Sequence, residues 1–445
     1  MRISVIGCGY LGAVHAASMA KLGHEVVGVD TDATKVEALA QGDAPFFEPD
    51  LPELLREQVA SGRLSFTTDI ADAAGAMVHF VCVGTPQRKN SYAADMTYVD
   101  AAVEALVPHL APGSLVAGKS TVPVGTAHRL AELVTEAQPD AALAWNPEFL
   151  REGLAVRDTL HPDRIVYGLP DEGGVSNGVG GDPRRAEALL DEVYATPLAE
   201  GVTKLVTDHA TAELVKVAAN SFLATKISFI NAMSEVCEAT GADVTALADA
   251  IGMDVRIGRK FLNAGLGFGG GCLPKDIRAF MSRAGELGAD QALSFLAEVD
   301  SINMRRRVRM VDLAREECGG SVVGHRIAVL GAAFKPNSDD VRDSPALNVA
   351  AQLQLQGADV VITDPQANGN AAKAWPTLNF AETPEEAAEG AELVLLLTEW
   401  QVFRELDPAT FGQIVKTRRI IDGRNVLDPV TWRDAGWTYR ALGRP

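Results

Sequence analysis

The sequence predicts an α/β protein in which two α/β halves flank a helical middle. In both halves, short β-branched runs alternate with stretches of helical character, which is typical of a parallel sheet covered by helices on both faces. Between the halves, residues 211–240 contain neither proline nor glycine and predict one long connecting helix, whose length suits a dimer-forming element. We place the three parts at residues 1–205, 206–305 and 306–445.

The strands of each half are recognisable as runs of apolar and β-branched residues. In the first half they are expected at 2–6, 25–30, 77–83, 114–119, 142–145 and 164–168. In the second half they are expected at 326–331, 359–364, 393–398 and 419–422. Helical character returns after a glycine-rich interruption at 265–271, whereas the polar, glycine-rich segment 171–183 is expected to be a mobile surface loop with no assigned function.

Composition restricts the classes of partner. The 445-residue chain has 40 Lys and Arg against 59 Asp and Glu, and this formal charge of −19 disfavours binding to nucleic acid or to an anionic membrane surface. The longest apolar run, 393–397, is far shorter than the roughly 18 residues of a membrane span, and no leader is recognisable. Five irregularly spaced cysteines do not form a disulfide framework. We therefore expect a soluble, cytoplasmic protein.

The clearest motif is Gly7-x-Gly9-x-x-Gly12, which follows the first strand and opens a helix. In a dinucleotide-binding unit the first glycine permits a tight turn, the second lets the backbone approach a pyrophosphate, and the third lets helix and strand pack closely. The helix N-terminus offers N–H groups to the phosphates. Asp30, 18 residues past Gly12, ends the next strand, where a carboxylate accepts from ribose hydroxyls and repels a 2′-phosphate. The first half is thus predicted to be a Rossmann-like domain that binds NAD rather than NADP; a purely structural glycine turn is the alternative.

Two other turns of the first half follow predicted strands. Residues 83–86 come after one strand and residues 120–123 after the next. Open α/β sheets bind ligands at the carboxyl edge of their strands, so both turns are candidate ligand contacts. Ordinary turn chemistry explains them equally well.

The segment FGGGCLPKD at 268–276 contains the candidate reactive group. Gly269 to Gly271 allow a ligand to approach closely, and Pro274 suits the first turn of a helix, so that Cys272 lies near the positive end of the helix dipole. Lys275 adds a cation that further favours the thiolate, and Asp276 places a carboxylate nearby, which makes Cys272 a candidate nucleophile.

A buried structural cysteine is the alternative interpretation of Cys272, and it is the one that we give to Cys8, Cys82, Cys237 and Cys318. No second Cys or His stands at ligand spacing from Cys272, so no metal site is expected.

Taken together, the motifs resemble those of the UDP-glucose/GDP-mannose dehydrogenase family, in the family's order and from end to end of the chain. They are GCGYLG at 7–12, VCVGTP at 81–86, STVPVGT at 120–126, NPEFLREG at 146–153, ELVKVAANSFLATKISFIN at 213–231, FGGGCLPKD at 268–276, FKPNSDDVRDSP at 334–345 and DGRNVLD at 422–428.

The resemblance implies an N-terminal Rossmann-like NAD domain, a central helical dimerisation domain with the catalytic cysteine, and a C-terminal Rossmann-like α/β domain that binds the UDP-sugar. Family members oxidise the C6 alcohol of a nucleotide sugar to a carboxylate with two NAD⁺, and the chain is most similar to bacterial members that make UDP-glucuronate from UDP-glucose, a precursor of polysaccharides. Cys272 would trap the aldehyde as a thiohemiacetal and then carry a thioester that water hydrolyses. A homodimer is expected.

The resemblance also assigns roles to individual residues. Lys216 would stabilise negative charge on the substrate oxygen, and Asn220, one helical turn later, would hold that oxygen or a water. Asp276 and Glu152 would handle protons, with Thr121 ordering water or cofactor. The cofactor contacts would be Gly7, Gly9, Tyr10, Leu11, Gly12, Asp30, Lys35, Val83, Thr85, Pro86, Thr121, Glu152, Lys275 and Arg342. The substrate contacts would be Glu148, Phe149, Leu150, Arg151, Glu152, Lys216, Asn220, Phe261, Leu262, Asn263, Ala264, Gly265, Gly269, Lys335 and Arg424.

Several alternatives stay open at this point. A helix start after Pro147 explains Glu148 and Glu152, and a solvated surface charge explains each of Lys216, Lys335 and Arg342. Among substrates GDP-mannose is the main alternative, although Gly153 favours UDP-glucose and the cysteine segment disfavours UDP-N-acetylmannosamine. Two classes without covalent chemistry also remain: a two-electron hydroxy-acid or 6-phosphogluconate-type dehydrogenase, and a non-catalytic NAD-sensing module.

Overall fold

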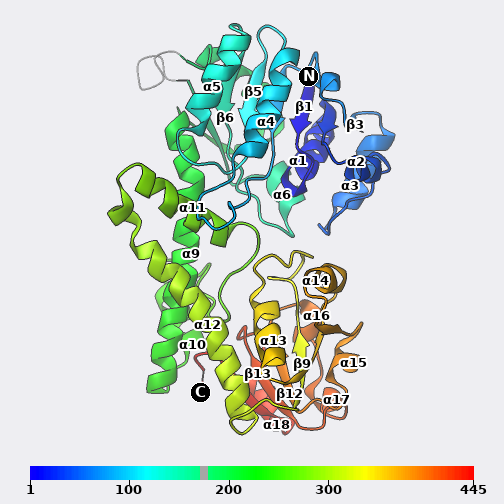
Figure 1. The fold of residues 1–445 in the computed structure, drawn as a ribbon, viewed down its shortest axis with the longest axis vertical. Coiled ribbons are helices and arrows are strands. Elements are labelled where there is room, and N and C mark those ends of the chain that lie inside the picture. The colour runs from blue at the N-terminus through cyan, green and yellow to red at the C-terminus, as the bar shows by residue number, and fades with distance from the viewer. Residues whose placement is uncertain (171–178, 445) are drawn as a thin grey trace. The chain divides into compact units, whose positions relative to one another are not determined.

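The computed structural model describes residues 1–170 and 179–444, which form two compact units (Figure 1). The first unit comprises Met1–Ala219 and Arg278–Leu287, and the second comprises Asn220–Ile277 and Gly288–Pro445. Two helices, α9 (His209–Thr240) and α11 (Leu273–Glu286), contribute residues to both units. Of the predicted surface loop at 171–183, residues 171–178 lie outside the described part of the chain.

The first unit contains an eight-stranded sheet in the order β3-β2-β1-β4-β5-β6-β7-β8. Its strands are β1 (Arg2–Ile6), β2 (Glu25–Val29), β3 (Leu64–Thr67), β4 (Val78–Val81), β5 (Leu115–Gly118), β6 (Ala142–Trp145), β7 (Arg164–Leu169) and β8 (Thr203–Asp208). The first six strands follow the doubly wound order 3-2-1-4-5-6, which places a topological switch point between β1 and β4.

Helices cover both faces of this sheet. They are α1 (Tyr10–Lys21), α2 (Ala33–Ala40), α3 (Leu51–Ala60), α4 (Thr97–Leu106), α5 (Thr126–Ala137), α6 (Ala155–Leu160), α7 (Pro183–Val193) and α8 (Ala195–Ala199), with short 3₁₀ turns at Ile70–Ala73 and Val107–His109. Alternation along β1 separates two cores: Ile3 and Val5 pack into one cluster with α1, whereas Ile6 packs into another with α4 and α5.

The expectation of a fully parallel first sheet is wrong at one pair, because β7 runs antiparallel to β6. Both strands are buried, and a strand buried on both faces has the same apolar pattern whichever way it runs. Strands β3 and β8 were not predicted. In β3 only Leu64 is fully buried, and β8 is largely exposed, so neither has the buried apolar run that a sequence pattern reveals.

The predicted long helix is confirmed as α9, of 32 residues. Asp208 precedes this helix and caps its N-terminus: its carboxylate accepts hydrogen bonds from the backbone N–H and from the hydroxyl of Thr211, both at 2.8 Å. The second unit continues with α10 (Val244–Gly252), the start of α11, a 3₁₀ turn at Asp290–Leu293 and α12 (Phe295–Glu317).

The second unit also contains a six-stranded parallel sheet in the order β11-β10-β9-β12-β13-β14. The four predicted strands are β9 (Arg326–Leu330), β10 (Asp359–Thr363), β12 (Leu393–Leu396) and β13 (Arg419–Asp422), and the unpredicted edge strands are β11 (Asn379–Phe380) and β14 (Thr438–Ala441). Its helices are α13 (Pro345–Leu355), α14 (Asn368–Ala374), α15 (Pro384–Ala388), α16 (Gln401–Arg404), α17 (Pro408–Phe411) and α18 (Pro429–Asp434). This sheet repeats the 3-2-1-4-5-6 order, so a second switch point lies between β9 and β12.

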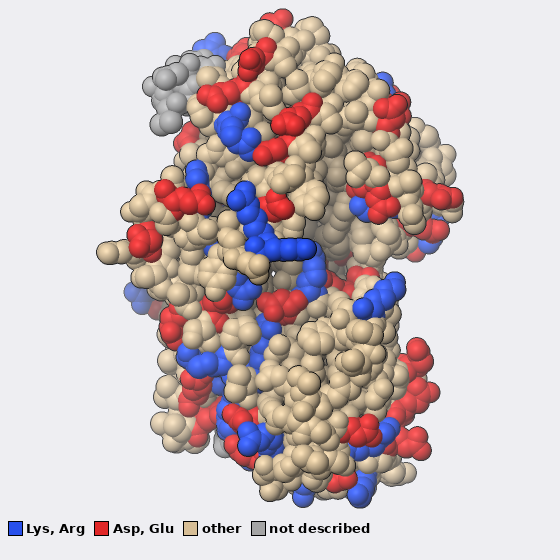
Figure 2. Space-filling view, viewed as in Figure 1, with Lys and Arg blue, Asp and Glu red and all other residues tan. Residues whose placement is uncertain are grey.

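Acidic and basic side chains are interspersed over the face shown in Figure 2. Among the described residues, no helix is long and apolar enough to cross a membrane.

Candidate active site

The glycine motif has the geometry that a dinucleotide requires. Gly7 has φ +88°, and a Cβ added at Gly12 would lie 1.8 Å from the carbonyl oxygen of Gly7, so this turn and the start of α1 depend on glycine. A Cβ added at Gly9 would meet no described heavy atom within 4 Å. Gly9 therefore faces open space at the N-terminus of α1, where a pyrophosphate fits.

Asp30 follows β2 beside this turn and is 9% exposed. Its Oδ2 accepts from the backbone N–H of Cys8 at 2.8 Å and from Nζ of Lys35 at 2.9 Å. Its carboxylate is thus fixed at the end of β2, the position from which it can bind ribose hydroxyls. These residues fit NAD, with Lys35 paired to the carboxylate.

The turns that follow the neighbouring strands β4 and β5 are bonded to each other. The hydroxyl of Thr85 donates to the carbonyl of Thr121 at 2.7 Å, and the hydroxyl of Ser120 donates to the carbonyl of Val83 at 2.6 Å. The predicted contacts Val83, Thr85 and Thr121 therefore lie together at the carboxyl edge of the first sheet.

Lys216 and Glu148 form a mostly buried ion pair, with 2.8 Å between Nζ and Oε1. Oε2 of Glu148 accepts from the backbone N–H of Leu150 at 2.8 Å, and the Lys216 ammonium lies 5.8 Å from the ring centre of Phe149. A surface charge is thereby ruled out for Lys216. The pair joins α9 to the 146–153 segment.

Two groups that the sequence did not single out hold the same segment. Glu48 is buried and accepts from the backbone N–H groups of Gly153 and Ala155, both at 2.6 Å, and from the hydroxyl of Tyr10. Burial raises the pKa of both Tyr10 and Glu48. Tyr10, predicted as a cofactor contact, therefore also ties α1 to the segment that carries Glu152.

Lys119 is the second such group. It is buried, and its Nζ donates to Oδ1 of Asn146 at 2.9 Å and to the hydroxyl of Tyr194 at 3.1 Å. Burial lowers the pKa of Lys119 to about 8. Arg151, predicted as a substrate contact, is held by Asp158 through two hydrogen bonds of 2.8 and 2.6 Å.

In the second unit Cys272 is exposed and directly precedes α11. Its carbonyl accepts the N–H of Asp276 at 2.9 Å, which is the first bond of that helix, so the thiol stands at the helix N-terminus. Asp276 is buried and accepts from Lys275 Nζ and from Asn220 Nδ2, the latter at 2.6 Å.

The other four cysteines are buried, in agreement with their structural interpretation. Burial raises the pKa of Cys82 to about 12 and also raises that of Cys8, Cys237 and Cys318. Among the described residues, no group of three or more His, Cys, Asp or Glu is arranged to hold a metal ion.

The glycines before Cys272 have other residues packed closely on them. A Cβ at Gly269 would lie 2.4 Å from the carbonyl oxygen of Asp343, and one at Gly271 would lie 2.2 Å from the guanidinium carbon of Arg342. Arg342 therefore lies against the backbone next to Cys272, and its guanidinium is oriented by Asp340 through bonds of 2.7 to 3.0 Å.

The segment 261–268, which contains the predicted substrate contacts Phe261 to Gly265, is held from two sides within the second unit. From α9, Oδ1 of Asn231 accepts the N–H of Gly265 at 2.8 Å. From the second sheet, Nη1 of Arg424 donates to the carbonyl of Gly267 at 3.0 Å, while its Nε donates to the carbonyl of Leu397 at 2.7 Å. Arg424, predicted as a substrate contact, thus anchors the loop.

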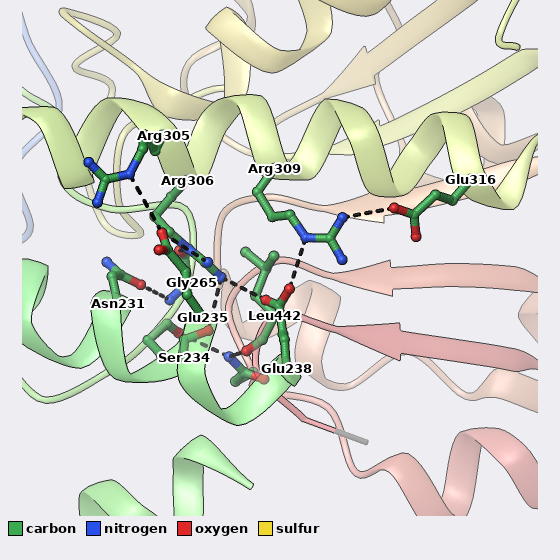
Figure 3. Close-up of polar contacts among 12 residues, drawn as sticks. Asn231, Ser234, Glu235, Glu238, Gly265, Arg305, Arg306, Arg309, Glu316 and Leu442 are labelled. Carbon is green, nitrogen blue, oxygen red and sulfur yellow. Dashed lines mark hydrogen bonds and ion pairs between the residues drawn. The ribbon is translucent and has the colours of Figure 1, made fainter. Parts of the chain in front are cut away.

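Arg306 of α12 supports the same loop from inside (Figure 3). Its side chain is 0% exposed, donates to the carbonyl of Gly265 at 3.4 Å and to the hydroxyl of Ser234 at 2.9 Å, and pairs with Glu238 at 3.2 Å. Sequence reasoning missed Arg306, since a charged residue inside a helix looks like a surface position.

Lys335 follows β9 at the second switch point, 5.3 Å from the ring centre of Phe334.

Comparison with known proteins gives one consistent family. The models of the UDP-glucose/GDP-mannose dehydrogenase family match its NAD binding domain at residues 1–196, its central domain at 210–305 and its UDP binding domain at 328–429. A UDP-glucose 6-dehydrogenase of Rhizobium meliloti is 42% identical over 449 residues, covering 100% of both chains, and one of Bacillus subtilis is 40% identical, covering 100% of this chain and 98% of the relative. The solved structure of a UDP-glucose dehydrogenase from Pyrobaculum islandicum superposes with a TM-score of 0.88 at 38% identity, covering 100% of this chain and 98% of the other. The chain therefore belongs to the UDP-glucose/GDP-mannose dehydrogenase family, whose cofactor is NAD.

Proposed function

We propose that the chain oxidises C6 of UDP-glucose to the carboxylate of UDP-glucuronate through a covalent intermediate on Cys272. The observation that carries this proposal is the exposed thiol at the N-terminus of α11, preceded by a glycine run on which Asp343 and Arg342 pack closely. The full-length relatives named as UDP-glucose 6-dehydrogenases support the choice of substrate.

The covalent role of Cys272 follows from the chemistry of a four-electron oxidation. NAD, when bound, would supply the hydride acceptor for two oxidations at C6. Between them, the Cys272 thiolate adds to the aldehyde carbon, a C–S bond forms, and the carbonyl oxygen takes up a proton to give a thiohemiacetal. After the second oxidation the thioester is attacked by water, the C–S bond breaks, and the thiolate returns as the carboxylate leaves.

The buried polar groups supply charge stabilisation and proton transfer. Lys216, held by Glu148 at 2.8 Å, stabilises negative charge on the C6 oxygen. Asn220 and Asp276, bonded to each other at 2.6 Å, orient the oxygen or the hydrolytic water, and Glu152 receives the proton. Arg342 and Lys275 bind the cofactor, and Lys335 binds the nucleotide sugar.

The experiment that tests this function is an NADH-production assay with UDP-glucose, GDP-mannose and UDP-N-acetylmannosamine as substrates of the purified full chain. We expect turnover with UDP-glucose and at least about hundredfold lower kcat/KM with the other two, since a site built to hydrogen-bond one substrate rejects analogues by large factors. Preferential turnover of GDP-mannose would overturn the substrate assignment, and release of a free aldehyde would overturn the covalent route.

We also propose that the chain forms a homodimer through α9. Phe222, Phe229 and Val236 recur every seven residues along this helix and are 67%, 48% and 53% exposed, which makes an apolar stripe in a helical element. Light scattering is expected to give twice the 47.1 kDa chain mass, and Phe229→Lys to give the monomer. A monomeric parent protein would refute this dimer.

None of the five cysteines forms a disulfide, and we propose the reducing cytoplasm as the protein's location.

A further inference from the structure

Glu213 is a buried carboxylate that none of the motif assignments uses. It lies on α9, three residues before Lys216, and is 2% exposed. Its Oε2 accepts the N–H of Gly125 and its Oε1 accepts the N–H of Ala127, both at 2.7 Å. Glu213 thereby caps the N-terminus of α5, whose own N-cap residue, Gly125, supplies no side-chain cap.

The turn that Glu213 binds is also held by α11. Nε of Arg283 donates to the carbonyl of Val124 at 2.9 Å, and Nη1 of the same arginine pairs with Glu286 at 2.8 Å. Gly125 has φ +96°, and a Cβ there would lie 3.2 Å from the Arg283 guanidinium. A carboxylate from α9 and a guanidinium from α11 thus hold the turn through Val124, Gly125 and Ala127.

Each of the three elements that meet here carries a residue of the proposed active site. The turn carries Thr121, whose carbonyl is bonded to Thr85 at 2.7 Å; α9 carries Lys216; and α11 begins directly after Cys272. Gly125 and Ala127 lie 88 and 86 residues before Glu213 in the sequence, so this contact joins distant parts of the chain.

We propose that Glu213 is a positioning residue for the oxidation: its carboxylate, together with Arg283, holds the 120–126 turn on α9 and α11 and thereby fixes Thr121 relative to Lys216. This inference rests on the proposed function for its catalytic consequence, while the clamp itself is a property of the first unit alone. A pocket of about 400 Å³, lined by residues 123–126 with Arg129 and Arg283, lies beside the clamp.

The Glu213 carboxyl group must be ionised to accept both N–H bonds. Burial raises the pKa of Glu213 to about 7, and the N–H groups of α5 and the charge of Arg283 only partly offset this. The charged or titratable groups nearby include Lys216 and His209 on its own helix, with His209 bonded to the carbonyl of Leu143, and Arg88, Glu286 and the Asp100–Arg129 pair around the pocket. Above that pKa the carboxylate has an acceptor oxygen for each N–H group.

The clamp is tested by hydrogen–deuterium exchange of the amides of Gly125 and Ala127 in the full chain, corrected for intrinsic rates, at about pH 8, above the raised pKa of Glu213. We expect both amides to be protected in the parent protein and to lose this protection in Glu213→Gln, which cannot accept from both N–H groups. Glu132→Gln on the exposed side of α5 is the matched control and should keep the parent protection. Rapid exchange of both amides in the parent protein would refute the clamp whether or not the variant folds.

The kinetic consequence is measured separately with the same variants. Glu213→Gln should lower kcat at about pH 8 by at least about tenfold, with KM for UDP-glucose changed little, because a misplaced group costs rate rather than binding. Glu132→Gln should keep the parent kcat and KM. An unchanged kcat in Glu213→Gln, with exchange altered as expected, would overturn the positioning role; absence of any turnover in the parent protein would instead overturn the proposed function and leave the exchange result standing.

Discussion

Asn220 and Asp276 are hydrogen-bonded in the interior of the second unit, with 2.6 Å between Nδ2 and Oδ2. Both side chains are buried, and Lys275 pairs with the other oxygen of the same carboxylate. The carboxylate four residues past Cys272 is therefore engaged through both oxygens, and a helix that carries Lys216 is bonded to the helix that Cys272 opens.

We expect Asn220→Ala to lower both stability and turnover. The buried Asp276 carboxylate loses a donor, which costs about 1–3 kcal/mol of unfolding free energy. Thermal melting and kcat for NADH formation measure the two effects, and Asn348→Ala, which loses only a contact with Gln352 at 2.7 Å, is the control. Unchanged melting and kcat in Asn220→Ala would show that the bond has no such role.

Alkylation should distinguish Cys272 from the other cysteines. Because Cys272 is exposed while burial raises the pKa of the other four thiols, iodoacetamide at neutral pH is expected to modify Cys272 first. Peptide mass spectrometry should show a single label that appears in step with the loss of activity, and UDP-glucose should slow it. Cys318→Ser should behave like the parent protein. Full activity after complete labelling of Cys272 would contradict the covalent mechanism.

Gly9→Ala and Gly12→Ala are expected to fail in different ways. The Cβ at Gly12 would collide with the Gly7 carbonyl at 1.8 Å, so Gly12→Ala should lose stability even without ligand, by about 1–3 kcal/mol or more. The Cβ at Gly9 meets no described atom within 4 Å, so Gly9→Ala should melt like the parent protein and lose the stabilisation by NAD. Melting curves with and without NAD test both, and a normal NAD shift in Gly9→Ala would contradict the assigned pyrophosphate position.

Arg306 is expected to contribute far more to the free energy of unfolding than its neighbour Arg305. Arg306→Met removes a donor from the Gly265 carbonyl, while Glu238 keeps its bond from Arg309 at 2.8 Å, so the loss should be about 1–3 kcal/mol. Because Gly265 belongs to the predicted substrate loop, KM for UDP-glucose should also rise. Arg305, whose side chain is 47% exposed, should tolerate Met within about 0.5 kcal/mol. Equal denaturation midpoints for the two variants would refute the support of the loop by Arg306.

The parts of the fold that the sequence predicted are those that repeat a local pattern. A local pattern in the sequence predicts the strand Arg2–Ile6, the turn at Gly7 and the helix 211–240. The exposed strand β8 and the two-residue strand β11 offer no such pattern, and their pairing depends on tertiary context.

The supports of the site were beyond sequence reasoning for a related reason. Glu48 binds Gly153 across 105 residues, and Glu213 binds Gly125 across 88. A single buried glutamate has no recognisable pattern around it in the sequence. Cys272, in contrast, stands in a short motif of glycines, proline and lysine. The chemical groups were therefore predictable, and the groups that position them were not.

The central claim, oxidation at C6 through a thioester on Cys272, is tested most directly by the amount of NADH formed per UDP-glucose consumed, with mass spectrometry of Cys272 in acid-quenched turnover. The account predicts two NADH for each UDP-glucose, UDP-glucuronate as the product, and a Cys272 adduct of the UDP-sugar that is absent from Cys272→Ala. Formation of one NADH per UDP-glucose would contradict the account. Formation of two NADH per UDP-glucose by Cys272→Ala at the rate of the parent protein would also contradict it.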